Sequence, residues 1–295
     1  MILHMNKDIK VIKAYQNNNT LRKSFNTLAI NTFGLDFEDW YANGYWKENY
    51  IPYSILNKDK IIANISVSPM KFKYKGKIKN YIQLGTVMTD PSYRHQGLIK
   101  RLMSEIETDY FEKTDGYFLF ANDSVLDFYP KFGFTKAREY QYYKNINTTS
   151  EITIKNIPME KKEDWFPLEN AIKCSSIQSD FEMYNNMELI MFYITKFMQN
   201  NVYYLEAENA YIIAEVDSDT LILHNIFAKK QIDINKVIPS FGKSIKKVIL
   251  GFTPLQKDNF SIKNLTIDDT TLFVKGNLVK QMKNDKLQFP TLSHT

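Results

Sequence analysis

The segment from Tyr81 to Phe134 constrains the fold of this chain most, because strand, loop and helix signals follow one another within it. Residues 81–89 are rich in apolar and β-branched side chains over the length of a buried strand, which Asp-Pro-Ser at 90–92 ends. Gly97 opens a helix, because apolar residues recur after it at helical spacing. The apolar residues on this face are Ile99, Leu102, Met103 and Ile106.

The loop between this strand and this helix, residues 93–97, is predicted to bind an anion. The first N–H groups of a helix lack partners inside the helix, and the helix dipole is positive at that end. Gly97 would let a phosphate approach the backbone closely, and Arg94 could add a charged fork. Taken alone, such a loop is more often an ordinary turn between a strand and a helix.

The second half of the segment makes the pattern more specific. Gly116 to Ala121 is a short apolar strand that runs into the helix-starting residues 122–124. A short helix containing Tyr129 is expected next, and Pro130 and Gly133 should end it. These features together form a compound signature, in the order strand, anion-binding helix, strand, asparagine, tyrosine and Gly-Phe.

Two motifs, VMTDPSYRHQGLIKRLM at 87–103 and NDSVLDFYPKFGF at 122–134, resemble those of the GCN5-related N-acetyltransferases, the GNAT family. Arg94 and Gly97 match the pyrophosphate-binding motif of that family, whereas Ile99 departs from its usual Gly or Ala. The first motif is similar to that of the tandem-domain "enhanced intracellular survival" subgroup. The resemblance implies an α/β (α+β) fold, with a central mixed, mostly antiparallel sheet flanked by helices.

The resemblance also implies acetyl-CoA as the cosubstrate and names the residues that would contact it. The pantetheine arm would pair with the backbone of a bulged central strand at Val87, Met88 and Thr89. The remaining implied cofactor-binding residues are Arg94, His95, Gln96, Gly97, Leu98, Ile99 and Asn122. Tyr129 stands where the family keeps the acid that protonates the leaving thiolate, and a core tyrosine is the alternative.

The acceptor of the acetyl group is expected to be a small-molecule or peptide amine. Trp40 and Tyr45, in an aromatic and acidic segment, could hold it by cation–π contact, and packing is the alternative. Gln83 occupies the place where many family members carry a glutamate base, and it could orient a water or an amine. No base is assigned, and an aminoglycoside, a polyamine, a lysine side chain and a peptide terminus all stay open as acceptors.

The chain is expected to hold two domains and a tail. Residues 1–145 form the catalytic domain, and residues 151–280 repeat its layout without its motifs, as a degenerate GNAT-like domain. A helix is predicted from Ser179 to Gln199, and the polar tail 281–295 is predicted to be frayed. Direct transfer is preferred over an acyl-enzyme on Cys174.

Composition excludes several other classes. The net charge of +5 comes from scattered lysines, so nucleic acid is not expected as a partner. A single cysteine excludes an intrachain disulfide framework, and no metal is expected. No apolar run approaches the roughly 20 residues of a membrane span, and the first residues lack a signal peptide, so we expect a cytoplasmic protein with no membrane partner. Assembly into a homo-oligomer stays open.

Three functions are compatible with these observations. The first is an N-acetyltransferase in which a primary amine attacks acetyl-CoA directly. The second is a CoA-binding regulatory module without turnover, because the central strand lacks a carboxylate. The third is an aminoacyl transferase on cell-wall precursors, which also uses paired domains of this kind, but the phosphate loop at Arg94 and Gly97 argues against it.

Overall fold

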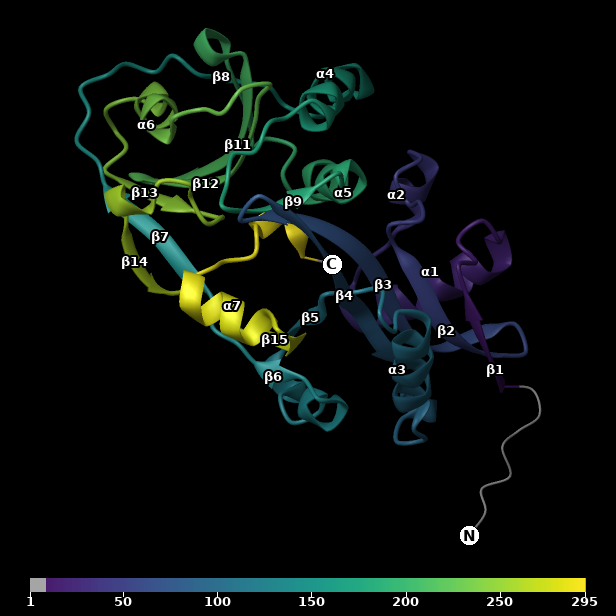
Figure 1. Cartoon of the computed structure of the whole chain (residues 1–295). Helices are drawn as coiled ribbons and strands as arrows, with labels where there is room; N and C mark the ends of the chain where they lie inside the picture. Colours follow the sequence, from purple (N-terminus) through teal and green to yellow (C-terminus); the bar gives the residue numbers. More distant parts are fainter. Residues whose placement is uncertain (1–8, 295) are drawn as a thin grey trace.

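The computed structural model describes residues 9–294, and it contains two mixed β-sheets with helices packed against them (Figure 1). This organisation confirms the predicted α/β fold class. The first residues, on which the prediction about a signal peptide rests, lie mostly outside the described range.

The first sheet has eight strands in the order β1-β2-β3-β4-β5-β15-β6, with β9 alongside β3. All of its strand pairs are antiparallel except β4 with β5, which is parallel. Strands β2, β3 and β4 form an antiparallel meander, and the strand predicted for residues 81–89 is confirmed as the second part of β4. The strands are β1 (Ile9–Lys13), β2 (Ile51–Asn57), β3 (Lys60–Tyr74), β4 (Lys77–Thr89), β5 (Gly116–Ala121), β6 (Thr135–Lys136), β9 (Phe181–Tyr184) and β15 (Thr271–Gly276).

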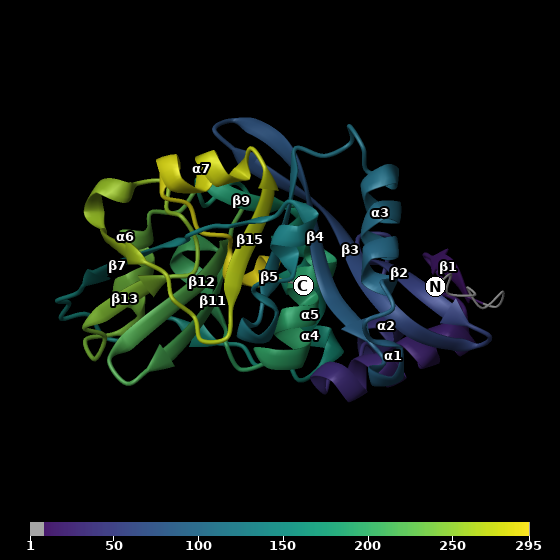
Figure 2. The same cartoon turned by 90° about the horizontal axis from the view of Figure 1, so that it is seen from below.

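Helices cover both faces of this sheet (Figure 2). On one face lie α1 (Asn19–Phe33) and α2 (Glu38–Ala42), and α1 buries Phe25 and Leu28 there. On the other face lies α3 (Leu98–Asp109), which buries Leu102 and Met103 against the strands. The helical spacing read from the sequence is therefore confirmed, and its apolar stripe is the face that contacts the sheet.

The second sheet repeats the layout of the first. Its order is β14-β7-β13-β12-β11-β10-β8, and its one parallel pair, among the described strands, is β12 with β13. Two helices, α4 (Lys162–Lys173) and α5 (Met187–Phe197), precede its meander, whereas the short α6 (Ile234–Val237) and a 3-10 turn (Ile238–Phe241) lie between the parallel strands. The strands are β7 (Tyr140–Asn145), β8 (Lys155–Asn156), β10 (Val202–Leu205), β11 (Ala210–Asp217), β12 (Thr220–Phe227), β13 (Lys247–Leu250) and β14 (Ser261–Asn264).

The two sheets exchange strands, so they do not divide the chain at residues 145–151. Strand β15 from the second half pairs with β5, and β9 pairs with β3. In return, β7 from the first half lies between β13 and β14 in the second sheet. Each sheet is therefore completed by a distant part of the chain.

Two expectations about the second half are wrong. The helix expected from Ser179 begins only at Met187, because residues 181–184 instead form β9 on the edge of β3. The tail expected to be frayed is ordered: α7 (Leu278–Asp285) is followed by Leu287 and Phe289, which are fully buried. Phe289 stacks on a phenylalanine of β5, so its burial holds this segment on the first sheet.

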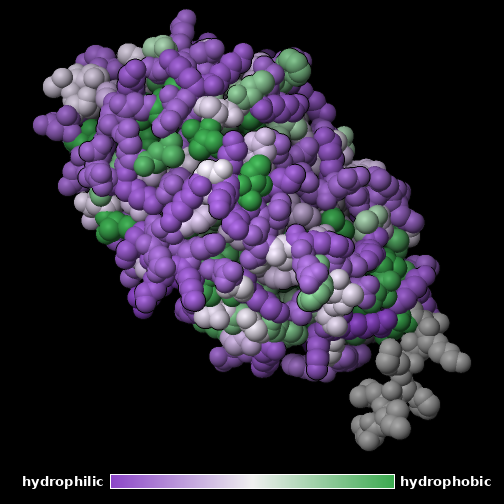
Figure 3. Space-filling model, viewed as in Figure 1, coloured by the Kyte–Doolittle hydropathy of each residue, from purple (hydrophilic) through white to green (hydrophobic). Residues whose placement is uncertain are grey.

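The surface seen in Figure 3 is mostly hydrophilic, with apolar residues in small separate groups. Within residues 9–294, no helix is both long enough and apolar enough to cross a membrane.

We predict that Glu139, which lies between β6 and β7, makes stability fall as pH rises. Its carboxylate accepts a hydrogen bond from the Phe289 N–H at 2.8 Å, and burial raises its pKa from 4.5 to about 7. Between these two pH values Glu139 ionises in the unfolded chain but stays protonated in the folded chain. This difference lowers the free energy of unfolding by on the order of 3 kcal/mol as pH rises. In Glu139→Gln, the free energy of unfolding, measured in urea from pH 4 to 8, should fall less steeply with pH.

The matched control is Glu151→Gln, because Glu151 is exposed and paired only with a lysine on the surface. This variant should keep the wild-type pH profile. Equal slopes for wild type and Glu139→Gln would contradict the prediction.

Candidate active site

Strands β4 and β5 part at the centre of the first sheet. Their parallel pairing covers only Tyr81 to Gln83, and the register then ends although both strands continue. On the other side of β4, the pairing with β3 slips, so that Thr86 and Val87 lie opposite the single residue Ile65. This β-bulge turns β4 away from β5, as the family resemblance implied.

A cavity of about 940 Å³ lies where the strands part. It reaches from the amino end of α3 on one face of the sheet to the end of α1 on the other face. The described residues that line it are Thr32, Phe33, Leu35, Leu84, Gly85, Thr86, Val87, Met88, Thr89, Tyr93, Arg94, His95, Gln96, Gly97, Leu98, Ile99, Lys100, Phe120, Ala121, Asn122, Ser124, Val125, Phe128, Tyr129, Lys131 and Phe132.

The predicted anion loop lies at one end of this cavity. A short 3-10 turn, residues 91–93, links β4 to the loop, and Gly97 precedes α3 with φ +72°, a left-handed conformation that favours glycine. A side chain at this position would meet nothing within 4 Å, so the glycine is required by the backbone rather than by packing. Because Gly97 has no side chain, the space beside the first N–H groups of α3 is open at this position.

Charge around the cavity favours an anionic ligand. Arg94, Lys100 and Lys131 line it, and none of the described lining residues is acidic. Asp90 lies just before the loop, where its carboxylate accepts the Ser92 N–H at 2.9 Å and pairs with Lys60 at 2.5 Å. The Lys60 ammonium lowers the pKa of Asp90, so this carboxylate stays ionised and fixes the start of the loop.

Tyr129 and Asn122 line the same cavity from the segment that follows β5. Tyr129 is 5% exposed, packs between aromatic rings that include Phe134 and Phe273, and burial raises its pKa to about 12. Its hydroxyl is therefore protonated at neutral pH. Asn122 accepts a hydrogen bond from the Ser124 hydroxyl at 2.7 Å.

The short helix expected around Tyr129 is not an α-helix. Two 3-10 turns, residues 123–125 and 129–132, take its place, and Gly133 ends the second with φ +79°. Pro130 accounts for the break, because a proline has no N–H to donate and restricts the residue before it. The side chain of Tyr129 nevertheless lies in the cavity.

Three residues predicted to contact the acceptor do not line the described cavity. The Trp40 indole is buried and donates to the Glu188 carbonyl oxygen at 2.9 Å, and the Tyr45 hydroxyl donates to the Glu169 carboxylate. Gln83 is fully buried within the sheet. The packing alternative therefore describes the two aromatic residues better, because Trp40 is held by α5 and Tyr45 by α4.

The residues that do line the far end of the cavity were missed by the sequence analysis. Phe33 and Leu35 come from the end of α1 and the loop after it, and Phe120 comes from β5. The ring of His294 stacks on Phe120 with 3.7 Å between ring centroids, and burial lowers its pKa to about 4. Scattered apolar residues carry no sequence signal for such a role, since they resemble any core position.

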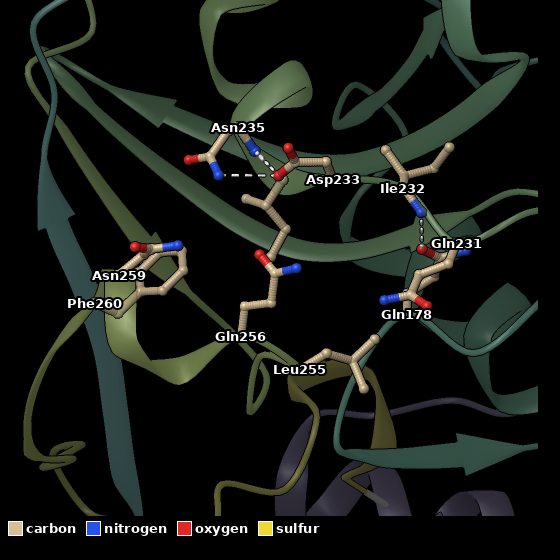
Figure 4. Close-up of a pocket in the computed structure, with 10 residues that line it drawn as sticks. Gln178, Gln231, Ile232, Asp233, Asn235, Leu255, Gln256, Asn259 and Phe260 are labelled. Atoms are coloured by element: carbon tan, nitrogen blue, oxygen red, sulfur yellow. Dashed lines mark hydrogen bonds between the residues drawn. The ribbon is translucent and has the colours of Figure 1, made fainter.

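A second, smaller cavity of about 260 Å³ lies in the second half of the chain (Figure 4). Several of its polar groups bond to one another: Asp233 accepts from the backbone and side chain of Asn235, and Gln178 accepts from the Ile232 N–H. It contains none of the predicted site residues. Cys174 is exposed, and residues 9–294 hold no group of three or more potential metal ligands.

One family model matches the first part of the chain. Residues 13–137 match the model described as the acetyltransferase (GNAT) domain. No curated protein matches the sequence significantly.

Solved structures match nearly the whole chain at low identity, so they show its fold. A conserved protein of unknown function from Enterococcus faecalis V583, described as a probable N-acyltransferase, is 14% identical with a TM-score of 0.62, over 93% of this chain and 74% of that one. Eis1 from Mycobacterium abscessus is 13% identical with a TM-score of 0.55, over 90% and 72%. A GCN5-related N-acetyltransferase from Anabaena variabilis is 16% identical with a TM-score of 0.53, over 90% and 72%.

Proposed function

We propose that the protein transfers an acetyl group from acetyl-CoA to a primary amine, because residues 13–137 match the acetyltransferase (GNAT) domain model. The observation that carries the proposal is one continuous cavity. It joins the anion loop at α3, the parted strands β4 and β5, and Tyr129. A phosphate-bearing thioester and a second substrate could thus meet from opposite faces of the sheet.

The residues present fit acetyl-CoA as a substrate. The loop from Arg94 to Ile99 would hold the pyrophosphate with backbone N–H groups and the arginine side chain. The exposed edge of β4, from Val87 to Thr89, would pair with the pantetheine arm, because β5 has left that edge unoccupied. Asn122 lines the opposite wall and would donate to the arm.

The transfer itself needs three contributions. The amine nitrogen attacks the thioester carbonyl, and the oxyanion that forms would accept a hydrogen bond from a backbone N–H of the bulge, at Val87. Tyr129 would then protonate the departing thiolate. The apolar lining at Phe33 and Phe120 would favour the neutral form of the amine by desolvation, and we assign no general base.

Two alternatives make different predictions. A regulatory module would bind acetyl-CoA without turnover, and an aminoacyl transferase on cell-wall precursors would not need the phosphate loop. The protonated hydroxyl of Tyr129 in the cavity favours the enzyme over the regulatory module. Calorimetric titration with acetyl-CoA, followed by a thiol-release screen across amines, distinguishes the three. Binding with release supports the proposal, binding without release on any amine supports the module, and no binding contradicts both.

Removal of the Tyr129 hydroxyl should slow the reaction without weakening cosubstrate binding. In Tyr129→Phe we expect kcat to fall about 100-fold, because the thiolate leaves without a proton donor. The dissociation constant for acetyl-CoA should stay within about threefold, since the ring that lines the cavity remains. The matched control is Tyr142→Phe, which removes a hydroxyl that donates to the Lys286 carbonyl oxygen outside the cavity. An unchanged kcat in Tyr129→Phe would exclude the acid role.

A side chain at position 97 should weaken acetyl-CoA binding. Gly97→Ala is expected to raise the calorimetric dissociation constant at least about tenfold, because the methyl group would stand where the phosphate approaches and φ is positive. Gly44→Ala is the matched control: Gly44 has φ +78° and open space around it, but it does not line the cavity. Both variants should lose similar stability, about 1 kcal/mol. Equal affinities in the two variants would contradict the phosphate site.

The acceptor end of the cavity should prefer an apolar amine with one charge. Phe33, Leu35 and Phe120 line this end, and acidic side chains are absent from the described lining. We therefore expect phenethylamine or an alkylamine to give a higher kcat/KM than spermidine, which gains nothing from its additional charges. A higher kcat/KM for spermidine at physiological salt would contradict this preference.

A further inference from the structure

We propose that Asn64 on β3 is a positioning residue for acyl transfer: its side-chain amide holds the bulge of β4 so that the Val87 N–H points into the cavity. The effect on acyl transfer rests on the proposed function. The way in which Asn64 holds the bulge rests only on the geometry of β3 and β4. Asn64 itself does not line the described cavity.

The bulge contains a strained residue. Thr86 has φ +46°, and a β-branched residue in the left-handed region is a genuine outlier. Such a conformation costs roughly 1–3 kcal/mol and persists only where surrounding contacts impose it. Contacts that hold Thr86 are therefore needed to keep the bulge in this shape.

Asn64 supplies the contact to the backbone of Thr86. Its Nδ2 donates to the Thr86 carbonyl oxygen and to the Ser66 hydroxyl, both at 2.9 Å, and its Oδ1 accepts from the Ser54 hydroxyl at 2.8 Å. Ser54 in turn shares a hydrogen bond of 2.6 Å with the hydroxyl of Tyr15. Asn64, Ser54 and Ser66 are fully buried, so the polar atoms depend on one another rather than on water.

The side chain of Thr86 is held separately, by the aromatic segment before β2. The hydroxyls of Tyr50 and Thr86 share a hydrogen bond of 2.5 Å. Tyr50 is fixed by its neighbours, because its carbonyl oxygen accepts from the Trp46 indole at 3.0 Å and its ring stacks on Phe37 with centroids 5.6 Å apart. The aromatic residues thus act on the cavity through Thr86.

The direction of the next N–H follows from the Thr86 carbonyl. All peptide bonds described are trans, and in a trans peptide the N–H points opposite to the C=O. Since the Thr86 carbonyl points toward Asn64 on β3, the Val87 N–H points away from β3, on the side that β5 has left. Val87 lines the cavity and has no partner in the described registers of β4. With this direction, the Val87 N–H would donate to an oxyanion in the cavity.

Asn64→Leu tests this mechanism, because leucine has a similar size and cannot donate. We expect kcat to fall about 10- to 100-fold, as for an oxyanion donor that is no longer fixed, with the dissociation constant for acetyl-CoA within about threefold. Asn201→Leu is the matched control: the Asn201 Nδ2 also donates to a backbone carbonyl at a bulge, that of Ala214 in the second sheet, at 3.2 Å. It should keep the wild-type kcat.

A second substitution separates positioning from general stability. Glycine adopts positive φ without strain, so Thr86→Gly should restore at least about fivefold of the kcat lost in Asn64→Leu. A purely structural role for Asn64 predicts a lower melting temperature, an unchanged kcat in the folded variant and no rescue. Either an unchanged kcat or a failure of rescue would overturn the proposal.

A readout that does not need turnover keeps the two proposals distinct. In a crystal structure of Asn64→Leu, Thr86 should leave the positive-φ region and its carbonyl should turn away from β3. Retention of φ near +46° in that variant would overturn the inference even if the wild type is active. If the wild type releases no thiol with any amine, the proposed function fails, and this crystal structure still decides whether Asn64 holds the bulge.

Discussion

The parting of β4 from β5 is the constraint on which the rest of this structure depends. A sheet that pairs fully has no free N–H groups at its centre, whereas here the pairing ends after Gln83 and a cavity opens between the two strands. The parting requires the bulge at Thr86, and the bulge requires buried polar and aromatic contacts from β3 and from the segment before β2. A β-branched residue with positive φ, Thr86, and a fully buried amide, Asn64, therefore lie at the point where the sheet is open.

The part of the site that follows from local backbone rules could be predicted from the sequence. Gly97, Arg94 and the apolar stripe of α3 predicted a helix with an open amino end, because periodicity and the glycine report directly on backbone conformation. The strand at residues 81–89 and the place of Tyr129 in the motif after β5 followed from the same segment. The turn around Tyr129 was predicted less well, because Pro130 favours 3-10 turns over the expected helix.

The rest depended on contacts between distant parts of the chain. Trp40 and Tyr45 lie in a segment with the aromatic and acidic composition expected of an amine site. In the structure, Trp40 is buried against α5 and Tyr45 against α4. The entry of β15 into the first sheet, and the burial of Phe289 beside it, depend on pairing with β5, which no local pattern encodes. Asn64 looked like any polar residue in a strand, and only the register of β3 with β4 brings it to the Thr86 carbonyl.

A crystal structure of the protein with CoA bound is the most direct test of the site between β4 and β5. We expect the pyrophosphate at the N–H groups that follow Arg94, and the pantetheine arm between β4 and β5, paired with the backbone from Val87 to Thr89. The thiol should lie near the Tyr129 hydroxyl. CoA bound elsewhere, such as in the cavity between α6 and Phe260, or a β4 edge that closes onto β5, would contradict the account.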